Sequence, residues 1–266
     1  MLNFPKYRTP PVTEVVLNIQ FNPLESYSNA YAGWFWKEYL GTEWTTTRDA
    51  PHLPEKFEKF DANSGNFFVN QLHIRTDVVT ERTQFFSNDR KHLIQIQSSR
   101  FIYNWIKQDN DYPTYELLLP EFKKYFKLFE DFVRDNKLGQ ITPNQWEVIY
   151  VNNLNPQGQT KINDLSSIFN GFYIPTIYGS DVCDGVDLKW SHIIGENRGR
   201  LVTQIKHITR GGEESEFVEL RFTARGPLER GMPYEDGFAI GREAIVKTFA
   251  QITDQNTQKN VWEKVE

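Results

Sequence analysis

The sequence predicts an α+β fold in which antiparallel sheets are each covered on one face by long amphipathic helices. Three observations predict it. Several segments alternate polar and apolar residues with the period of two that a half-buried strand requires. Two long segments, 115–136 and 234–265, repeat apolar residues at helical spacing. Strands precede each of these helices, so the chain reads as two halves with a similar order of elements.

The first alternating segment, Val12 to Phe21, is expected to form a strand that ends at Asn22-Pro23. Aromatic residues then recur at helical spacing from about Ser26 to Leu40, and a glycine follows that is expected to stop the helix. Residues 42–66 are polar and contain several prolines. They indicate a long loop with a short strand near Trp44, and loops of this length often carry function.

The longest run of strand-forming residues is Leu93 to Ile106, LIQIQSSRFIYNWI. We expect a central strand or a bent pair of strands here, with a bend or bulge at Ser98-Ser99. Segments 66–74 and 82–87 are expected to be its antiparallel neighbours. One face of this sheet is expected to be core, while the other is unusually rich in amide side chains.

Residues 115–136 give the clearest helical pattern, and Pro120 either starts this helix proper or kinks it after an initial turn. Hairpin turns rich in Gly and Asn separate the strands of the second half. The remaining strands are expected at 146–154, 188–194, 201–209 and 217–223, with a terminal helix at 234–265.

Residues 156–186 are rich in Asn, Gly, Ser and Pro and are the best candidate for a boundary. They would connect an N-terminal half, 1–155, with a strand-helix-meander-helix-strand order, to a C-terminal half, 187–266, formed by a three-strand meander and the terminal helix. One continuous domain is also compatible with this order.

Composition excludes several classes of protein. A chain of 266 residues can bury a sizeable core. Its net charge of −5 argues against a general polyanion binder, and its single cysteine excludes an internal disulfide. No apolar run approaches the length of a membrane span, and the N-terminal stretch has no signal-peptide pattern. We therefore expect a cytoplasmic protein.

No local motif for a metal, a cofactor or a nucleophile is present, so none is expected. The five histidines form no metal-binding pair by spacing. His192 and His207 are expected to be cross-strand neighbours around a hairpin, although two ordinary surface histidines are the favoured interpretation. Cys183 lies between Asp181 and Asp184, and their negative charges would raise the pKa of its thiol and disfavour a nucleophile.

Two groups of residues are candidate binding sites. Arg100, Asn104, Trp105 and Asn152 could together present amides and an indole to a polar small molecule or a peptide; a core Trp105 and strand-capping asparagines explain them equally well. Lys206, Arg221 and Arg225 could gather on the outer face of the C-terminal meander and bind phosphate or nucleic acid. Ion pairs with the interleaved glutamates are the favoured interpretation of this second group.

Four stretches carry a resemblance to a known family. They are Pro10–Val15 (PPVTEV), Gln95–Trp105 (QIQSSRFIYNW), the 115–136 helix and Tyr150–Asn152 (YVN). Together they resemble a sporadically distributed family of bacterial proteins of similar length whose function is uncharacterised. The resemblance spans essentially the whole chain. It implies a bacterial cytosolic protein and carries no catalytic residue across.

These observations lead us to expect a non-enzymatic binding or regulatory protein that acts through contact with an unknown protein partner, with a homodimer as one form. The alternative is a nucleic-acid or nucleotide-binding protein that uses the basic sheet face of the C-terminal half. A second alternative is a hydrolase that uses a carboxylate pair or the His192/His207 pair.

Overall fold

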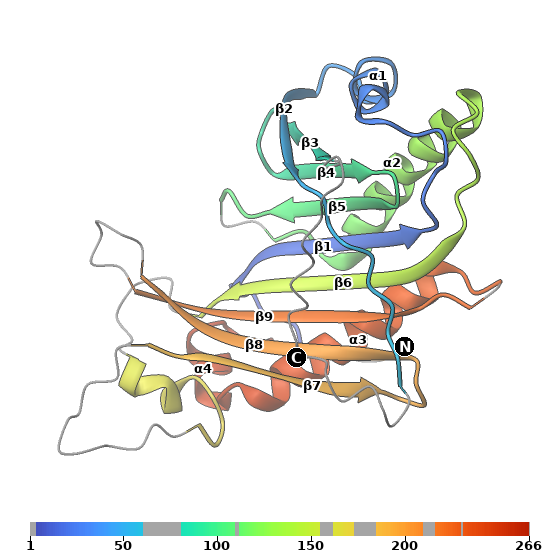
Figure 1. The fold of residues 1–266 in the computed structure, drawn as a ribbon. Helices are drawn as coiled ribbons and strands as arrows, with labels where there is room; N and C mark the ends of the chain where they lie inside the picture. Colours follow the sequence, from blue (N-terminus) through green and yellow to red (C-terminus); the bar gives the residue numbers. More distant parts are fainter. Residues whose placement is uncertain are drawn as a thin grey trace.

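The computed structural model describes residues 4–60, 81–109, 112–154, 162–172, 185–209, 216–229 and 231–265. Within them the chain forms a nine-stranded antiparallel sheet with the order β2-β3-β4-β5-β1-β6-β9-β8-β7, together with four α-helices (Figure 1). The strands are β1 (Val12–Phe21), β2 (Trp44–Pro51), β3 (Glu81–Ser87), β4 (His92–Gln97), β5 (Arg100–Ile106), β6 (Pro143–Asn153), β7 (Asp187–Ile194), β8 (Gly199–Thr209) and β9 (Glu216–Pro227). The helices are α1 (Asn29–Tyr39), α2 (Tyr115–Asp135), α3 (Tyr234–Ile252), α4 (Gln255–Asn260) and the 3₁₀ helix η1 (Ile162–Ser167).

The path of the chain explains the strand order. From β1 the chain passes through α1 to the edge strand β2, then returns through β3 and β4 to β5 beside β1, and α2 follows. From β6, on the other side of β1, it reaches the opposite edge strand β7, returns through β8 to β9 beside β6, and α3 follows. The pairing of β1 with β6 joins both halves into one continuous sheet.

The long helices pack on one face of the sheet. Helix α3 contacts β6, β9 and β8, whereas α1 contacts β3 and β4, and α2 contacts β5 (Figure 1). Alternate residues of β1, such as Val15, Leu17 and Ile19, join the hydrophobic core on this side, as the period of two predicted. We refer to this surface as the helix face.

Helix α2 supplies an aromatic seam to the core. Its side chains Phe122, Phe126 and Phe129 each lie within 6 Å of the Phe101 ring on β5, measured between ring centroids. Helix α2 begins at Tyr115, so Pro120 lies inside the helix and does not start it. The amphipathic pattern of 115–136 thus predicted both the helix and its buried side.

Trp146 of β6 lies under α3 in a cradle of glycines. A Cβ atom added to Gly237 or Gly241 of α3 would lie closer than 3.0 Å to the indole ring. One added to Gly226 of β9 or to Gly199 of β8 would also meet the ring at less than 3.0 Å. The Trp146 side chain is fully buried, so these glycines allow the helix to approach the sheet closely.

Several element boundaries differ from the sequence prediction. The stretch 93–106 is two antiparallel strands joined by a tight turn at Ser98-Ser99, because Gln97 pairs with Arg100. The single helix predicted for 234–265 is wrong: α3 ends at Ile252, and α4 begins after Asp254, whose carboxylate accepts a hydrogen bond from Thr257 N–H and caps the new helix.

Two further predictions lie partly or wholly outside the described residues, namely the strand at 66–74 and most of the connector at 156–186. In the part of the chain that is described, no helix combines the length and the apolar character needed to cross a membrane.

Candidate binding face

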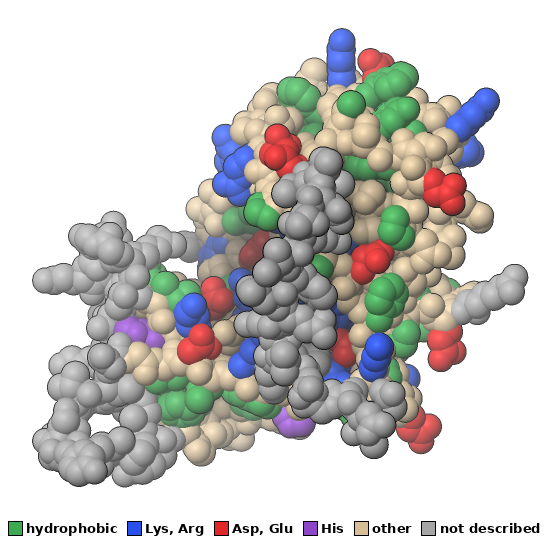
Figure 2. Space-filling view, viewed as in Figure 1, with side chains coloured by type: hydrophobic (Ala, Val, Ile, Leu, Met, Phe, Trp, Pro, Cys, Tyr) green, Lys and Arg blue, Asp and Glu red, His purple; other side chains and the backbone are tan. Residues whose placement is uncertain are grey.

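The sheet surface that faces away from α1, α2 and α3 is the polar face. Alternate residues of each central strand point to it, and strand pairing places them side by side in rows. Figure 2, drawn from this side, shows acidic and basic side chains interspersed over it. Many of its polar side chains are buried: Asn18, Gln20, Gln84, Gln95, Gln97, Arg100, Asn104, Gln145 and Arg225. The predicted amide-rich face of β4 and β5 is therefore confirmed.

A ladder of side-chain hydrogen bonds crosses five strands of the polar face. Arg48 Nε and Nη2 donate to Gln84 Oε1 at 2.9 and 2.8 Å. Gln84 then donates to Gln95 at 2.8 Å, and Gln95 donates to Asn104 at 2.8 Å. Asn104 Nδ2 completes the ladder by donating to Glu14 Oε1 at 2.6 Å. Each buried amide is thus paired with a neighbour on the next strand, which offsets the cost of burying it.

This ladder predicts a measurable loss of stability. Replacing Gln95 with leucine leaves the Gln84 donor and the Asn104 acceptor buried without a partner. We expect the free energy of unfolding to fall by about 1–3 kcal/mol, measured by urea denaturation. Gln204→Leu is the matched control, because Gln204 bonds the exposed Asp187, and we expect a change of about 0.5 kcal/mol or less. Equal losses in the two variants would contradict the ladder's role.

Beyond the ladder, the polar face carries a buried cluster of ion pairs. Arg225 Nη2 donates to Glu58 Oε1 at 2.6 Å, and Arg225 Nη1 donates to Glu147 Oε2 at 2.9 Å. Arg200 Nε donates to the second carboxylate oxygen of Glu58 at 2.8 Å. Asn18 Nδ2 donates to Glu147 Oε1 at 2.8 Å. All five side chains therefore form one connected network.

The network favours the charged forms of Glu147 and Arg225. Burial alone would raise the pKa of the Glu147 carboxyl, but the charges of Arg225 and Arg100 outweigh burial and hold this pKa below its ordinary value. Burial would likewise lower the pKa of Arg225, but the charges of Glu147 and Glu58 raise it. A carboxylate held in this state binds cations well and is poorly suited to donate a proton near neutral pH.

Arg100 is a buried cation of the face whose charge is only partly compensated. Burial lowers the pKa of its guanidinium, and the charge of Glu147 offsets this only in part. Its Nη2 donates to Gln20 Oε1 at 2.6 Å, while its buried Nε has no hydrogen-bond partner in the part of the chain that the structure describes. The centre of the polar face is therefore electrostatically suited to acceptor groups.

Residues 52–60, which we call the strap, run from the end of β2 across the polar face (Figure 1). The Gln97 side chain bonds both backbone groups of Leu53: the Leu53 N–H donates to Gln97 Oε1 at 3.1 Å, and Gln97 Nε2 donates to the Leu53 carbonyl at 2.9 Å. A side-chain amide here replaces the backbone partner that a neighbouring strand would provide.

The strap backbone is held in the same way at three further positions. These bonds join Arg100 Nη2 to the Pro54 carbonyl at 2.8 Å, the Lys56 N–H to Gln20 Oε1 at 2.9 Å, and the Glu58 N–H to Gln145 Oε1 at 3.4 Å. Positions 54, 56 and 58 alternate, as expected of an extended chain whose inward-facing groups repeat every second residue. The row of binding side chains comes from β4, β5, β1 and β6 in turn.

The structure brings only part of the first predicted site together. Arg100 and Asn104 both lie on the polar face, whereas Trp105 points to the helix face, where it is 2% exposed and contacts Tyr112 at 5.4 Å between ring centroids. Asn152 shares the side of β6 that carries Trp146, and its amide donates to the Leu220 carbonyl at 3.0 Å. Trp105 and Asn152 therefore do not join Arg100 and Asn104 in one site.

The second predicted group does share a face. Pairing of β8 with β9 places Lys206 beside Glu219 on the polar face, together with Arg221 and Arg225. Arg221 Nε lies 3.1 Å from Glu219 Oε1, and Arg225 lies in the buried cluster described above. Both arginines are thus engaged by carboxylates.

The expected His192/His207 pair is wrong. The hairpin between β7 and β8 closes with Ile194 opposite Gly199, so His192 lies opposite Leu201. The backbone N–H of His207 instead bonds the Val186 carbonyl, far along the same pair of strands. Cys183, Asp181 and Asp184 lie outside the described residues, and among those that are described no group of three or more His, Cys, Asp or Glu is arranged to hold a metal ion.

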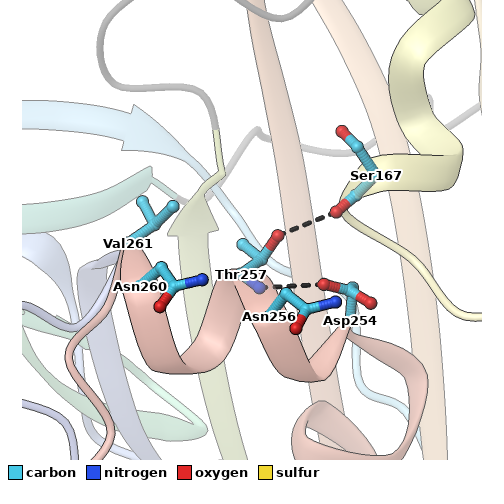
Figure 3. A pocket seen from close by; sticks show the side chains of 6 residues that line it. All are labelled: Ser167, Asp254, Asn256, Thr257, Asn260 and Val261. Atoms are coloured by element: carbon cyan, nitrogen blue, oxygen red, sulfur yellow. Dashed lines mark hydrogen bonds between the residues drawn. The ribbon is translucent and has the colours of Figure 1, made fainter.

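A shallow hollow of about 360 Å³ lies between η1 and α4 (Figure 3). Asp254 accepts the Thr257 N–H at 2.8 Å, and the Thr257 hydroxyl donates to the Ser167 carbonyl at 2.7 Å. Its polar groups therefore serve to hold α4 against η1, which makes the hollow a structural contact.

Sequence reasoning missed the strap and its Glu58. The only signal was a long polar loop, and a loop does not indicate which surface it crosses.

Comparison with known proteins adds no further assignment: no protein-family model matches the chain, and no curated protein matches it.

Proposed function

We propose that the chain is a non-enzymatic binding or regulatory protein that holds an extended segment of a partner protein on its polar face. One observation carries the proposal: side chains of four successive strands bond the backbone of the strap, at Leu53, Pro54, Lys56 and Glu58. Backbone recognition of this kind tolerates many sequences. It would hold another extended segment as well as it holds the strap.

The dimensions of the face fit this function. The row from β4 to β6 spans three strand spacings, or about 14 Å, and the six residues from Leu53 to Glu58 cover that span when extended, since each adds at most about 3.5 Å. The segment does not need to pair with an edge strand of the sheet, because it crosses the strands on their face.

The enzymatic alternative has less support. Glu58 and Glu147 both bond Arg225, so each carboxylate is engaged in ion pairing, and the two histidines named above are not neighbours. Nucleic-acid binding through Lys206, Arg221 and Arg225 is disfavoured for a related reason, since carboxylates already neutralise both arginines.

Selection of segments from a random-peptide library on the full chain tests this function. We expect the selected segments to lose about tenfold or more in affinity for a Gln97→Met variant, which keeps the side-chain volume but removes two backbone-binding groups. Gln204→Met on the same face is the matched control and should bind normally. Unchanged affinity for the Gln97 variant would contradict the proposal.

Two finer proposals accompany the function. We propose that the two halves are structurally similar, because each consists of a central strand, an excursion to a sheet edge, a returning meander and a helix. We also propose membership of the sporadically distributed bacterial family, a cytosolic location and a homodimer as one form, all on the sequence arguments alone.

A further inference from the structure

Glu58 is the one strap residue whose side chain is directed deeply into the polar face. Its side chain is 3% exposed, whereas the neighbouring Phe57 is 53% exposed and Lys56 and Lys59 are also exposed. Both carboxylate oxygens are bound, one by Arg225 and the other by Arg200. The strap thus leaves Pro54, Glu55, Lys56, Phe57 and Lys59 exposed to solvent and uses a single acidic side chain as an anchor.

We propose that Arg200 and Arg225 form a glutamate-binding subsite of the polar face, which Glu58 fills from within the chain until a partner segment with its own glutamate displaces the strap. This inference rests on the proposed function and adds the chemistry of the partner. The partner is an extended, acidic segment, and its glutamate occupies the position that Glu58 now holds.

Charge complementarity supports an acidic occupant. Arg225 and Arg200 lie on adjacent strands, directly opposite each other, and Arg225 also bonds Glu147. Without Glu58, Arg225 and the buried Arg100 would both depend on the charge of Glu147. An occupant without a carboxylate would leave two buried guanidiniums with one carboxylate at this end of the face, which is costly.

The backbone contacts fix both the register and the length of the acidic side chain. The same residue whose carboxylate meets the arginines donates its N–H to Gln145, and the residue two before it donates to Gln20. With the backbone held, an aspartate is one methylene too short to reach both guanidiniums. The subsite should therefore select glutamate over aspartate as well as over glutamine.

A synthetic peptide with the sequence of residues 51–60, PHLPEKFEKF, tests the subsite when its binding to the full chain is followed by fluorescence anisotropy. The receptor is the Glu58→Gln variant, in which the strap has lost its anchor. We expect this variant to bind the peptide at least tenfold more tightly than the unaltered chain does. We also expect tenfold weaker binding when the peptide carries Gln or Asp at the Glu58 position.

The matched control is the same peptide with Glu55→Gln, because Glu55 is exposed on the strap and should not affect binding. If Glu58→Gln prevents folding, Leu53→Pro is the second receptor, since it removes the N–H that Gln97 accepts and leaves both arginines untouched. A circular dichroism spectrum confirms that either receptor is folded.

Equal affinity for the Glu, Gln and Asp peptides would overturn the subsite, while library segments that still depend on Gln97 would leave the proposed function standing. Loss of all binding, including that of library segments, would overturn both. A receptor that forms a dimer with exchanged straps would also overturn the inference, because a second copy would then be the occupant.

Discussion

Replacing Trp146 with alanine is expected to lower the free energy of unfolding by about 3–5 kcal/mol. The indole is fully buried and lies between α3 and the sheet, so its removal leaves a large cavity that the rigid glycine cradle cannot close. Urea denaturation followed by circular dichroism measures this loss. Trp34→Ala on α1, where the indole is 52% exposed, is the control and should cost about 1 kcal/mol or less.

Alanine substitutions at Gly33 and Gly237 distinguish the effect of the glycine cradle from that of helix propensity. Alanine normally stabilises a helix relative to glycine by up to about 1 kcal/mol, and we expect this gain for Gly33→Ala in α1, where an added Cβ meets nothing within 4 Å. Gly237→Ala should instead destabilise by about 1–3 kcal/mol, because the methyl group collides with Trp146. A stabilising Gly237→Ala would contradict the close approach of α3 to the sheet.

Replacing Arg225 with methionine is expected to lower the free energy of unfolding by about 3–5 kcal/mol at neutral pH. The change leaves Glu58 and Glu147 buried in an ion-pair cluster that has lost the cation bonding both of them. Arg221→Met is the matched control on the same strand, since Arg221 is 37% exposed and pairs with Glu219 at the surface. We expect that control to lose about 0.5 kcal/mol or less.

The loss of unfolding free energy in Arg225→Met should be smaller at acidic pH than at neutral pH. In the unaltered protein the pKa of Glu147 is lowered on folding, so its stabilisation is complete above the unfolded pKa and is lost as the pH falls through the folded pKa. Without Arg225 the buried, ionised Glu147 carboxylate destabilises the folded protein at neutral pH, and its protonation in acid removes this destabilisation. Urea denaturation of both proteins at pH 7 and at about pH 3 measures this change. An equal loss of unfolding free energy at the two pH values would contradict the ion-pair account.

Local patterns predicted much of the fold. The period of two marked β1 and the amide-rich β4–β5 hairpin, and the apolar stripe of 115–136 marked α2, because those signals depend on neighbouring residues alone. The break between α3 and α4 was missed, although Asp254 is a good N-cap residue. The order of strands in the sheet depends on long-range pairing, and no local pattern reports it.

The candidate site was harder to predict. Asn104 and Trp105 are adjacent on one strand and must point to opposite faces, so period two alone separates them. Gln20, Gln97 and Arg100 carry a signal, since a strand rarely devotes a buried face to amides. The strap that they bind gave no signal of its position, because that position is set by contacts with strands that are distant in sequence.

Hydrogen exchange of the strap amides tests most directly whether the polar face is a binding face. The full chain is measured alone and with a segment chosen by library selection. Our account predicts that the N–H groups of Leu53, Lys56 and Glu58 lose protection when the segment binds, because it takes their partners Gln97, Gln20 and Gln145. Strap amides that remain protected in the bound complex would contradict the account.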